Sequence, residues 1–267
     1  MGHSPMSLKV NFSYAFALQF KESVRHHAFC LRMLPLSNGV QTLLDWSLKI
    51  NNNDIAFFQT RDGFGNHLLF GTMEKPHRHF EAMLRGNVAF HGSYHYKDTE
   101  NSALYLHPTP LTPFSSVVKA YLKTLILPQS PLSLSKMLNQ TIFHNFEYLA
   151  GVSTTTCDAD ALLLRNQGVC QDFSHLLITL LRLNGIPARY VAGFIDGEGE
   201  SHAWVEAYID GYWRGFDPTH GIVLDHQPYI KIAHGRDFLD CRLNRGVFIG
   251  KSQQHLRVNV TVAREEQ

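Results

Sequence analysis

The sequence predicts an α+β protein in which an antiparallel β domain is followed by a second domain with helices before strands. Three observations lead to this prediction. Apolar residues alternate with polar ones over most of the first 97 residues, which is the period of a strand. From residue 114 they recur at spacings of three and four, which is the period of a helix. From residue 188 short strands return, and helices followed by antiparallel strands are typical of an α+β domain.

The first domain, residues 1–97, is predicted to consist of strands joined by tight turns. Its strands are expected at residues 8–20, 29–34, 44–50, 55–60, 67–72 and 78–90. The clearest hairpin surrounds residues 62–66, where Gly63 and Gly65 permit the positive φ that a sharp reversal needs. Residues 98–112 are rich in charged and polar side chains and carry Pro108 and Pro110, which suits a connector.

The second domain, residues 113–267, begins with three predicted helices and ends with four predicted strands. The helices are expected at 114–125, 134–146 and 173–181, and the strands at 188–195, 202–209, 213–217 and 256–263. The third helix should stop at Asn184 and Gly185, because a glycine followed by Ile186-Pro187 favours a helix end and then extended chain.

Composition excludes several classes of protein. There are 24 Lys and Arg against 23 Asp and Glu, so no overall field attracts the chain to nucleic acid or to an anionic membrane. No run of about 18 apolar residues is long enough for a membrane span. The four cysteines have no Cys-x-x-Cys spacing and the N-terminus lacks a signal-peptide pattern, so a reducing, cytoplasmic location is expected.

Cys170 is the candidate nucleophile. It is placed at the start of the third helix, where the helix dipole and free backbone N–H groups favour a thiolate and lower a cysteine pKa from about 8.5 toward a range of roughly 3.5 to 7.5. A buried cysteine that only packs is the alternative, since cysteine is among the most buried residue types. Position alone does not decide between the two, so a partner base is required.

Register arithmetic identifies the partners among 16 histidines. Asp210-Gly211 predicts a two-residue hairpin turn, which sets Tyr208 opposite Trp213 and Trp204 opposite Asp217. His202 then shares a sheet face with Asp217 as its diagonal neighbour, about 7 to 8 Å away along the backbone. The opposite face would be the core side and would carry Ala203, Val205, Ala207 and Ile209.

These residues fit the roles of a catalytic triad. Cys170 would attack a carbonyl carbon, His202 would receive and return the proton, and Asp217 would orient the ring and stabilise its charged form. The backbone N–H of Cys170 would meet the oxyanion, and the side chains of Gln167 and Tyr148 are candidates for a second donor.

Four sequence blocks resemble the transglutaminase-like cysteine hydrolase family in its bacterial branch. The blocks are residues 168–175 (GVCQDFSH), 183–191 (LNGIPARYV), 201–206 (SHAWVE) and 213–219 (WRGFDPT), in the order and spacing of the family. The first half and residues 235–246 resemble that branch as well. The resemblance implies a papain-like core in which nucleophile, base and orienting acid fall on Cys170, His202 and Asp217.

The resulting expectation is a cysteine protease or amidohydrolase that forms an acyl-thioester on a peptide or protein substrate. Transfer of the acyl group to an amine, as in a transglutaminase, remains open, as does a binding module with a vestigial triad.

No cofactor and no metal are expected, because the pairs His26-His27, His77-x-His79 and His91-x-x-x-His95 lack a third ligand at a defined spacing. Residues 196–200 are read as a solvated acidic turn or a lid, and Trp204 as a packing residue or a wall of the cleft. The oligomeric state is not predicted.

Overall fold

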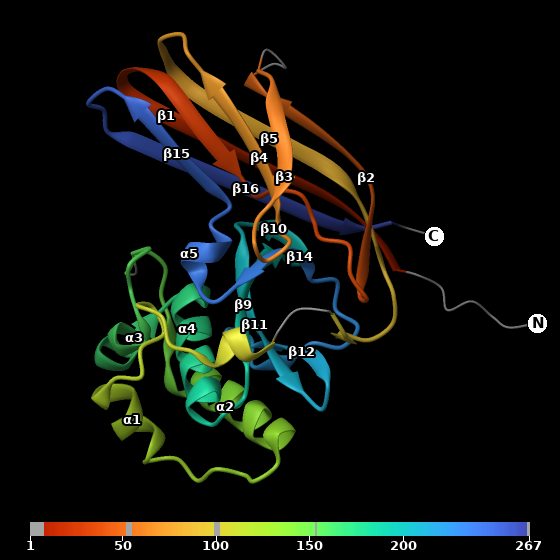
Figure 1. The fold of residues 1–267 in the computed structure, drawn as a ribbon, viewed down its shortest axis with the longest axis vertical. Helices are drawn as coiled ribbons and strands as arrows, with labels where there is room; N and C mark the ends of the chain where they lie inside the picture. Colours follow the sequence, from red (N-terminus) through yellow and green to blue (C-terminus); the bar gives the residue numbers. More distant parts are fainter. Residues whose placement is uncertain (1–7, 52–54, 99–101, 153, 266–267) are drawn as a thin grey trace, which may run out of the picture.

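A computed structural model describes residues 8–51, 55–98, 102–152 and 154–265. Figure 1 shows a β domain above a smaller body in which helices cover one face of a second sheet. The predicted α+β class is confirmed.

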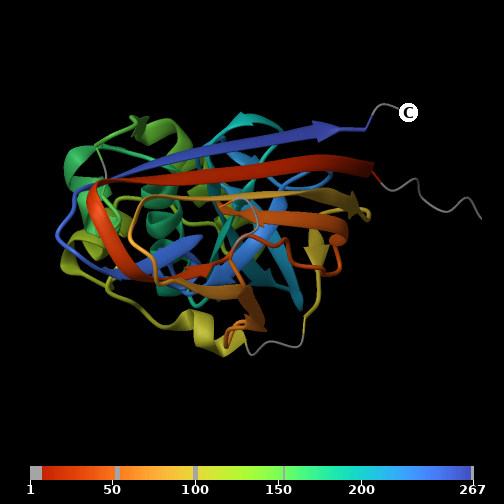
Figure 2. The same cartoon turned by 90° about the horizontal axis from the view of Figure 1, so that it is seen from above.

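The first sheet is organised around one long strand, β1 (Leu8–Leu31). Its first half pairs with β5 (His77–Phe90) and β16 (Gln254–Arg264), and its second half with β4 (His67–Met73) and β15 (Asn244–Ile249). Register shifts beyond Gln19 and a positive φ of 48° at His26 bend the strand between these halves. The sequence predicted two separate strands here, whereas the chain forms a single bent one that serves two sheet layers (Figures 1 and 2).

The other strands of this domain follow the prediction. β2 (Gln41–Ile50) pairs with β5, and β3 (Phe57–Arg61) pairs with β4 across the predicted hairpin. In that hairpin the Asp62 carboxylate accepts hydrogen bonds from the backbone N–H groups of Phe64 and Asn66, at 3.0 and 2.9 Å. The short side chain of an aspartate that begins a turn typically makes such bonds.

The two C-terminal strands, β15 and β16, are hydrogen-bonded into the first sheet. The sequence placed residues 113–267 in the second domain, but β16 pairs with β1 from Val10↔Arg264 to Phe20↔Gln254. An alternating pattern shows that a segment is a strand and does not show which sheet has an open edge for it. The first domain is therefore completed by the end of the chain, so the two halves of the structure are interleaved.

The second sheet has the order β13-β12-β11-β9-β14, with β6 beside β12. Its strands are β6 (His95–Tyr96), β9 (Ala188–Phe194), β11 (His202–Ile209), β12 (Tyr212–Asp217), β13 (Ile222–Val223) and β14 (Ile230–Gly235). The helices of the same half are η2 (Ser102–Leu106), α1 (Ser116–Leu122), α2 (Pro131–Asn145), α3 (Ala159–Arg165), α4 (Cys170–Leu183) and α5 (Phe238–Cys241). α3 was not predicted, and α1 is shorter than expected.

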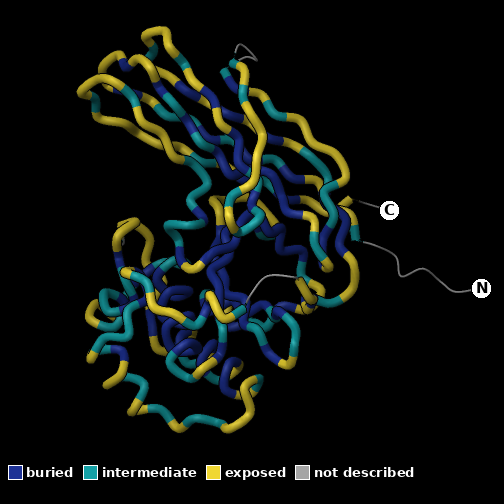
Figure 3. The backbone as a smooth tube through the Cα atoms, viewed as in Figure 1, coloured by how far each residue is buried: buried dark blue, intermediate teal, exposed yellow. Residues whose placement is uncertain are grey.

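Helix α4 is the central helix and is buried along nearly its whole length (Figure 3). The predicted apolar stripe from Phe173 to Leu181 packs against Ala203, Val205 and other residues of β9 and β11. The helix ends where expected, and Gly185 follows with φ of 75°. Burial of this stripe fixes the first residue of α4, Cys170, relative to the strands that carry His202 and Asp217.

Both faces of β11 are buried, which the sequence did not predict. Trp204 was expected on the face of His202, yet its side chain is fully buried under the first domain, as is that of Glu206, two residues further along the same face. Glu206 accepts hydrogen bonds from Arg189 and Lys231, each at 2.7 Å. These two cations offset the free-energy cost of burying the carboxylate. Their charges lower the pKa of Glu206 to about 2 despite burial. Because Trp204 and Glu206 are buried, only the His202 end of this face of β11 remains for the site.

Candidate active site

Cys170 is positioned by the turn that begins α4. The backbone of Val169 is extended, and its N–H donates to the Asp172 carboxylate at 2.9 Å, so Asp172 caps the helix from its third residue. Gly168 is required immediately before, because a Cβ there would come within 2.9 Å of both Asp172 and Leu162. Cys170 itself is partly buried. It is a free thiol, and so are Cys30, Cys157 and Cys241.

The hairpin that carries His202 and Asp217 has the predicted register. Asp210 and Gly211 both have positive φ, at 54° and 82°, which is the geometry of a type I′ turn. Tyr208 pairs with Trp213, as expected, and the ladder continues to Val205↔Phe216.

This register brings two of the three predicted residues into contact. His202 Nε2 lies 2.8 Å from Asp217 Oδ2, and Cys170 is close enough to the His202 ring to raise its pKa. Because Asp217 occupies Nε2, Nδ1 is the ring nitrogen available to the sulfur. The His202 imidazole thus lies between the N-terminus of α4 and Asp217, which is 15 residues further along the chain at the end of β12.

The surroundings of His202 stabilise its charged form. Burial lowers the pKa of the ring, but hydrogen bonds and charges from Asp217 and Cys170 outweigh this effect and raise the pKa to about 10. Asp217 is completely buried, and burial alone would raise its pKa. The hydrogen bonds from His202 and His220 instead hold the Asp217 pKa well below its usual range. At neutral pH the site therefore contains an imidazolium paired with a carboxylate.

Sequence reasoning missed two further side chains that hold Asp217. His220 Nδ1 lies 2.7 Å and the Tyr229 hydroxyl 2.8 Å from Asp217 Oδ2, while Oδ1 accepts from the backbone N–H groups of Thr219 and His220. The position of His220, three residues after the acid in a turn, is a local signal that could have identified it. Tyr229 arrives through a loop and gives no such signal.

The candidates for a second oxyanion donor differ in their surroundings. The Gln167 side chain donates to Glu147 at 2.7 Å, so its amide is already engaged. Tyr148 is about half exposed, and its pKa is raised by burial and by the charge of Cys170. These two residues lie on neighbouring strands of a small parallel pair, β7 (Glu147–Tyr148) and β8 (Gln167–Gly168), directly before the nucleophile.

Two other expectations near the site can be compared with the structure. Of the two roles expected for Trp204, that of a packing residue is confirmed, because the side chain is buried, with its ring centroid 6.5 Å from that of His202. The segment expected to be a solvated turn contains β10 (Gly197–Gly199), which pairs with β16. Asp196 also forms an ion pair with Arg264 at 3.1 Å, so the chain leading to His202 is attached to the first sheet.

One group of possible metal ligands occurs within the described residues. The ligand atoms of His202, Asp217 and His220 lie within 4.8 Å of one another. Hydrogen bonds to the shared oxygen account for this closeness. The histidine pairs considered from the sequence have other contacts: His27 meets His77 at 3.3 Å, and His79 meets Glu81 at 3.0 Å.

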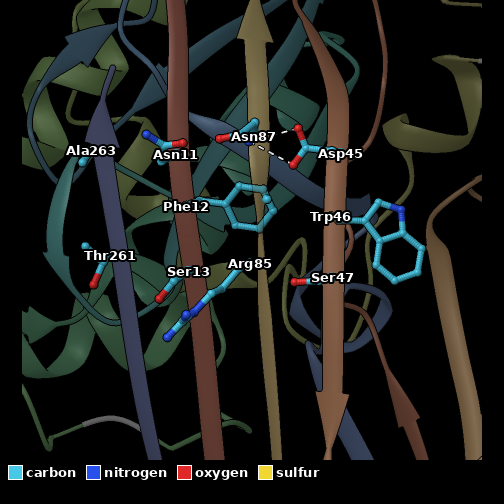
Figure 4. A pocket seen from close by; sticks show the side chains of 11 residues that line it. Asn11, Phe12, Ser13, Asp45, Trp46, Ser47, Arg85, Asn87, Thr261 and Ala263 are labelled. Atoms are coloured by element: carbon cyan, nitrogen blue, oxygen red, sulfur yellow. Dashed lines mark hydrogen bonds between the residues drawn. The ribbon is translucent and has the colours of Figure 1, made fainter. Parts of the chain in front are cut away.

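The first domain also carries a hollow on its sheet, shown in Figure 4. It is lined by residues of β1, β2, β5 and β16, among them Asp45, which accepts two hydrogen bonds from Asn87. All of its lining residues lie on strands of the first sheet, and Cys170, His202 and Asp217 are not among them, so it is separate from the candidate active site.

Fold and site together define a papain-like core joined to an N-terminal β domain. Residues 124–218 match the family described as "Transglutaminase-like superfamily", and residues 10–89 match "Bacterial transglutaminase-like N-terminal region". The chain belongs to the transglutaminase-like superfamily, in its bacterial branch with this N-terminal region.

Curated proteins and a solved structure are also similar to this chain. The chain is 32% identical over 169 residues to an uncharacterized protein of Mycobacterium leprae, covering 60% of each, and 32% identical over 176 residues to one of Mycobacterium tuberculosis, covering 60% of this chain and 54% of the relative. It therefore spans just over half the length of these relatives. The fold is similar to "a Putative Cysteine Protease from Cytophaga hutchinsonii", with a TM-score of 0.81 and 22% identity over 98% of this chain and 92% of the other.

None of the helices in the described ranges combines the length and apolarity needed to cross a lipid bilayer.

Proposed function

We propose that this protein is a cysteine-dependent amide hydrolase acting on a peptide or isopeptide bond. The observation that carries the proposal is the buried contact of His202 with Asp217 at 2.8 Å, beside the free thiol of Cys170, which acts on the pKa of the His202 ring. A structural cysteine needs no such arrangement, and the cost of burying His202 and Asp217 is offset by their mutual contact and by the other donors to Asp217. The family assignment supports a cysteine-dependent chemistry of this kind.

In the first half-reaction the sulfur of Cys170, as thiolate, attacks the carbonyl carbon of the amide. Negative charge develops on the carbonyl oxygen, and the backbone N–H of Cys170 at the helix start is placed to stabilise it. The protonated His202 donates its proton to the amide nitrogen, the C–N bond breaks, and the amine leaves. An acyl-thioester on Cys170 remains, and His202 is neutral.

In the second half-reaction water replaces the amine. Neutral His202 accepts a proton from water as the oxygen attacks the thioester carbon, the C–S bond breaks, and a carboxylic acid is released. Asp217 keeps its charge throughout, and it fixes the ring orientation that both proton transfers need. We extend the donor role at the oxyanion to Tyr148, because it lies on β7, which pairs with the strand just before Cys170, and its side chain is about half exposed.

The test is covalent labelling by a thiol-reactive acyl probe, with Cys170→Ala as the control and Cys241→Ala as the matched variant of a buried thiol. Labelling should be lost in the first variant and retained in the second. Equal labelling of wild type and Cys170→Ala contradicts the proposal and supports a binding module. Product analysis with and without a primary amine then separates hydrolysis from acyl transfer, because incorporation of the amine at the expense of hydrolysis identifies a transferase.

A further inference from the structure

A cavity of about 840 Å³ lies in the first domain and opens beside the candidate active site. Its walls come from β1, β4, β5, β15 and β16, and further lining residues, among them Thr155, Ser201 and Phe238, come from the catalytic half. Ser201 directly precedes His202. Thr155 follows Thr154, whose carbonyl accepts a hydrogen bond from Gln171, the residue after Cys170. A cavity of this size is typical of ligand sites, and two of its lining residues lie next to the segments that carry the reacting side chains.

The walls of this cavity are apolar and aromatic. Phe16, Phe29 and Phe80 line it as part of the packed interior, and the ring centroids of Phe29 and Phe80 are 4.9 Å apart. Other lining side chains face water instead: Phe70 is 41% exposed and Val247 is 71% exposed. Exposed apolar side chains that continue into an apolar cavity indicate a surface which a ligand covers.

The charged side chains of the lining are all cationic. Arg32, Arg242 and Arg245 line the cavity, and no aspartate or glutamate does. Arg32 pairs with Asp62 at 3.2 Å, whereas among the described residues Arg242 and Arg245 form no ion pair with a carboxylate. Two guanidinium groups beside an apolar cavity complement a ligand that has both a carboxylate and a bulky apolar group, because guanidinium binds carboxylate with two hydrogen bonds.

The strand next to these arginines favours a polypeptide as the ligand. β15, which carries Arg245 and Val247, pairs with β1 alone in the part of the chain that the structure describes. The backbone along its other edge is thus available to an extended peptide, and peptides commonly add to a sheet edge while alternate side chains enter a pocket.

We infer that this cavity selects the substrate of the proposed hydrolase. It binds an extended segment of the substrate in which a bulky apolar residue enters between the aromatic walls and a neighbouring acidic residue pairs with Arg245 and Arg242. This inference rests on the proposed function only for the statement that the bound segment is cleaved. The binding of an acidic, apolar peptide is measurable without turnover.

The experiment measures peptide binding by fluorescence anisotropy in the full chain carrying Cys170→Ala, which prevents turnover. Three fluorescein-labelled heptapeptides are compared: one with two phenylalanines flanked by glutamates, one with lysines in place of the glutamates, and one with serines in place of the phenylalanines. The first should bind about tenfold or more tightly than the other two. Arg245→Glu should weaken it about fivefold or more and should strengthen binding of the lysine peptide.

Two variants make the result specific to the cavity. Arg257→Glu is the matched control, because Arg257 is exposed on β16 between Leu256 and Val258, which line the cavity, so its side chain points to the other face of the strand. It should leave all three affinities unchanged. Val247→Ser should weaken both phenylalanine peptides about threefold and leave the serine peptide unchanged, and its high exposure makes unfolding by this change unexpected.

Equal affinity for the glutamate and lysine peptides, or equal losses in Arg245→Glu and Arg257→Glu, overturns the inference. Tighter binding of a fluorescent twelve-carbon fatty acid than of any peptide also overturns it and assigns the cavity to a lipid. Labelling of Cys170 by the small acyl probe, measured in Arg245→Glu with Cys170 intact, tests the proposed function separately. If labelling persists while peptide selectivity is absent, only the cavity inference fails.

Discussion

Replacing Asp217 by Asn perturbs the candidate site with little change in volume. All five groups that contact the two carboxylate oxygens, namely His202, His220, Tyr229 and two backbone N–H groups, are hydrogen-bond donors. Asparagine has one acceptor oxygen, so its NH₂ group must face donors on one side. The variant therefore loses the negative charge and leaves buried donors unsatisfied, which costs about 1–3 kcal/mol of stability.

The larger effect falls on the protonation of His202. Raising the pKa of this ring from 6.5 to about 10 corresponds to roughly 5 kcal/mol in favour of the imidazolium, shared between Asp217 and Cys170. Burial acts in the opposite direction. Without the Asp217 charge, the pKa of His202 should fall toward or below 6.5, so that the ring becomes largely neutral at pH 7.5. The proposed proton donor would then be missing, and labelling of Cys170 at that pH should slow about a hundredfold or more.

Histidine-labelled NMR measures this directly, with the His202 signal assigned by its loss in a His202→Gln variant. The wild-type ring should stay charged up to about pH 9, and the Asp217→Asn ring should titrate several pH units lower. The same linkage acts on stability. Since the folded pKa of His202 is raised, its contribution to the free energy of unfolding is complete below pH 6.5 and is lost as pH rises toward 10, and Asp217→Asn should flatten that decline. A His202 ring that titrates near its wild-type value in the variant would refute this electrostatic account.

Three further predictions follow from the same contacts. His220→Ala removes one of several donors to the acid, so labelling of Cys170 should slow no more than about tenfold, and a loss as large as that of Asp217→Asn would contradict a merely supporting role. Gly168→Ala forces a Cβ against the carboxylate that caps α4, so labelling should slow while circular dichroism stays native; an unchanged rate would show that the cap does not position the thiol. Glu206→Gln leaves the buried Lys231 without its anion and Arg189 with Asp98 alone, so it should lower the free energy of unfolding by about 3–5 kcal/mol in urea, against less than 1 kcal/mol if the ion pairs were dispensable. The pKa of Glu206 is lowered to about 2, so its stabilisation is present above pH 4.5 and should disappear as pH falls toward 2.

Local patterns in the sequence were sufficient for most of the elements around the site. The stripe from Phe173 to Leu181 predicted α4, and Asp210-Gly211 fixed the hairpin register, because turn residues with positive φ allow few loop lengths. The contact between His202 and Asp217 follows from that register, since both residues belong to one hairpin. These features depend on neighbours in the chain, which is the range over which a pattern is informative.

Contacts between distant segments were not predictable in the same way. Tyr229 reaches Asp217 through a loop, and β16 returns from the C-terminus to pair with β1, although nothing in either segment names its partner. The burial of Trp204 and Glu206 likewise required knowing that the first domain covers this face.

By itself the sequence determined the α+β class, the helix start at Cys170 and the face shared by His202 and Asp217, because backbone period, turn chemistry and strand register act over a few residues. The tertiary structure alone decided that Cys170 lies close enough to act on the pKa of His202, that His220 and Tyr229 also hold Asp217, and that the N-terminal sheet carries a cationic, apolar cavity lined in part by Ser201 and Thr155. Each of these depends on how two sheets and a central helix pack, and packing selects among many arrangements that the same local patterns allow.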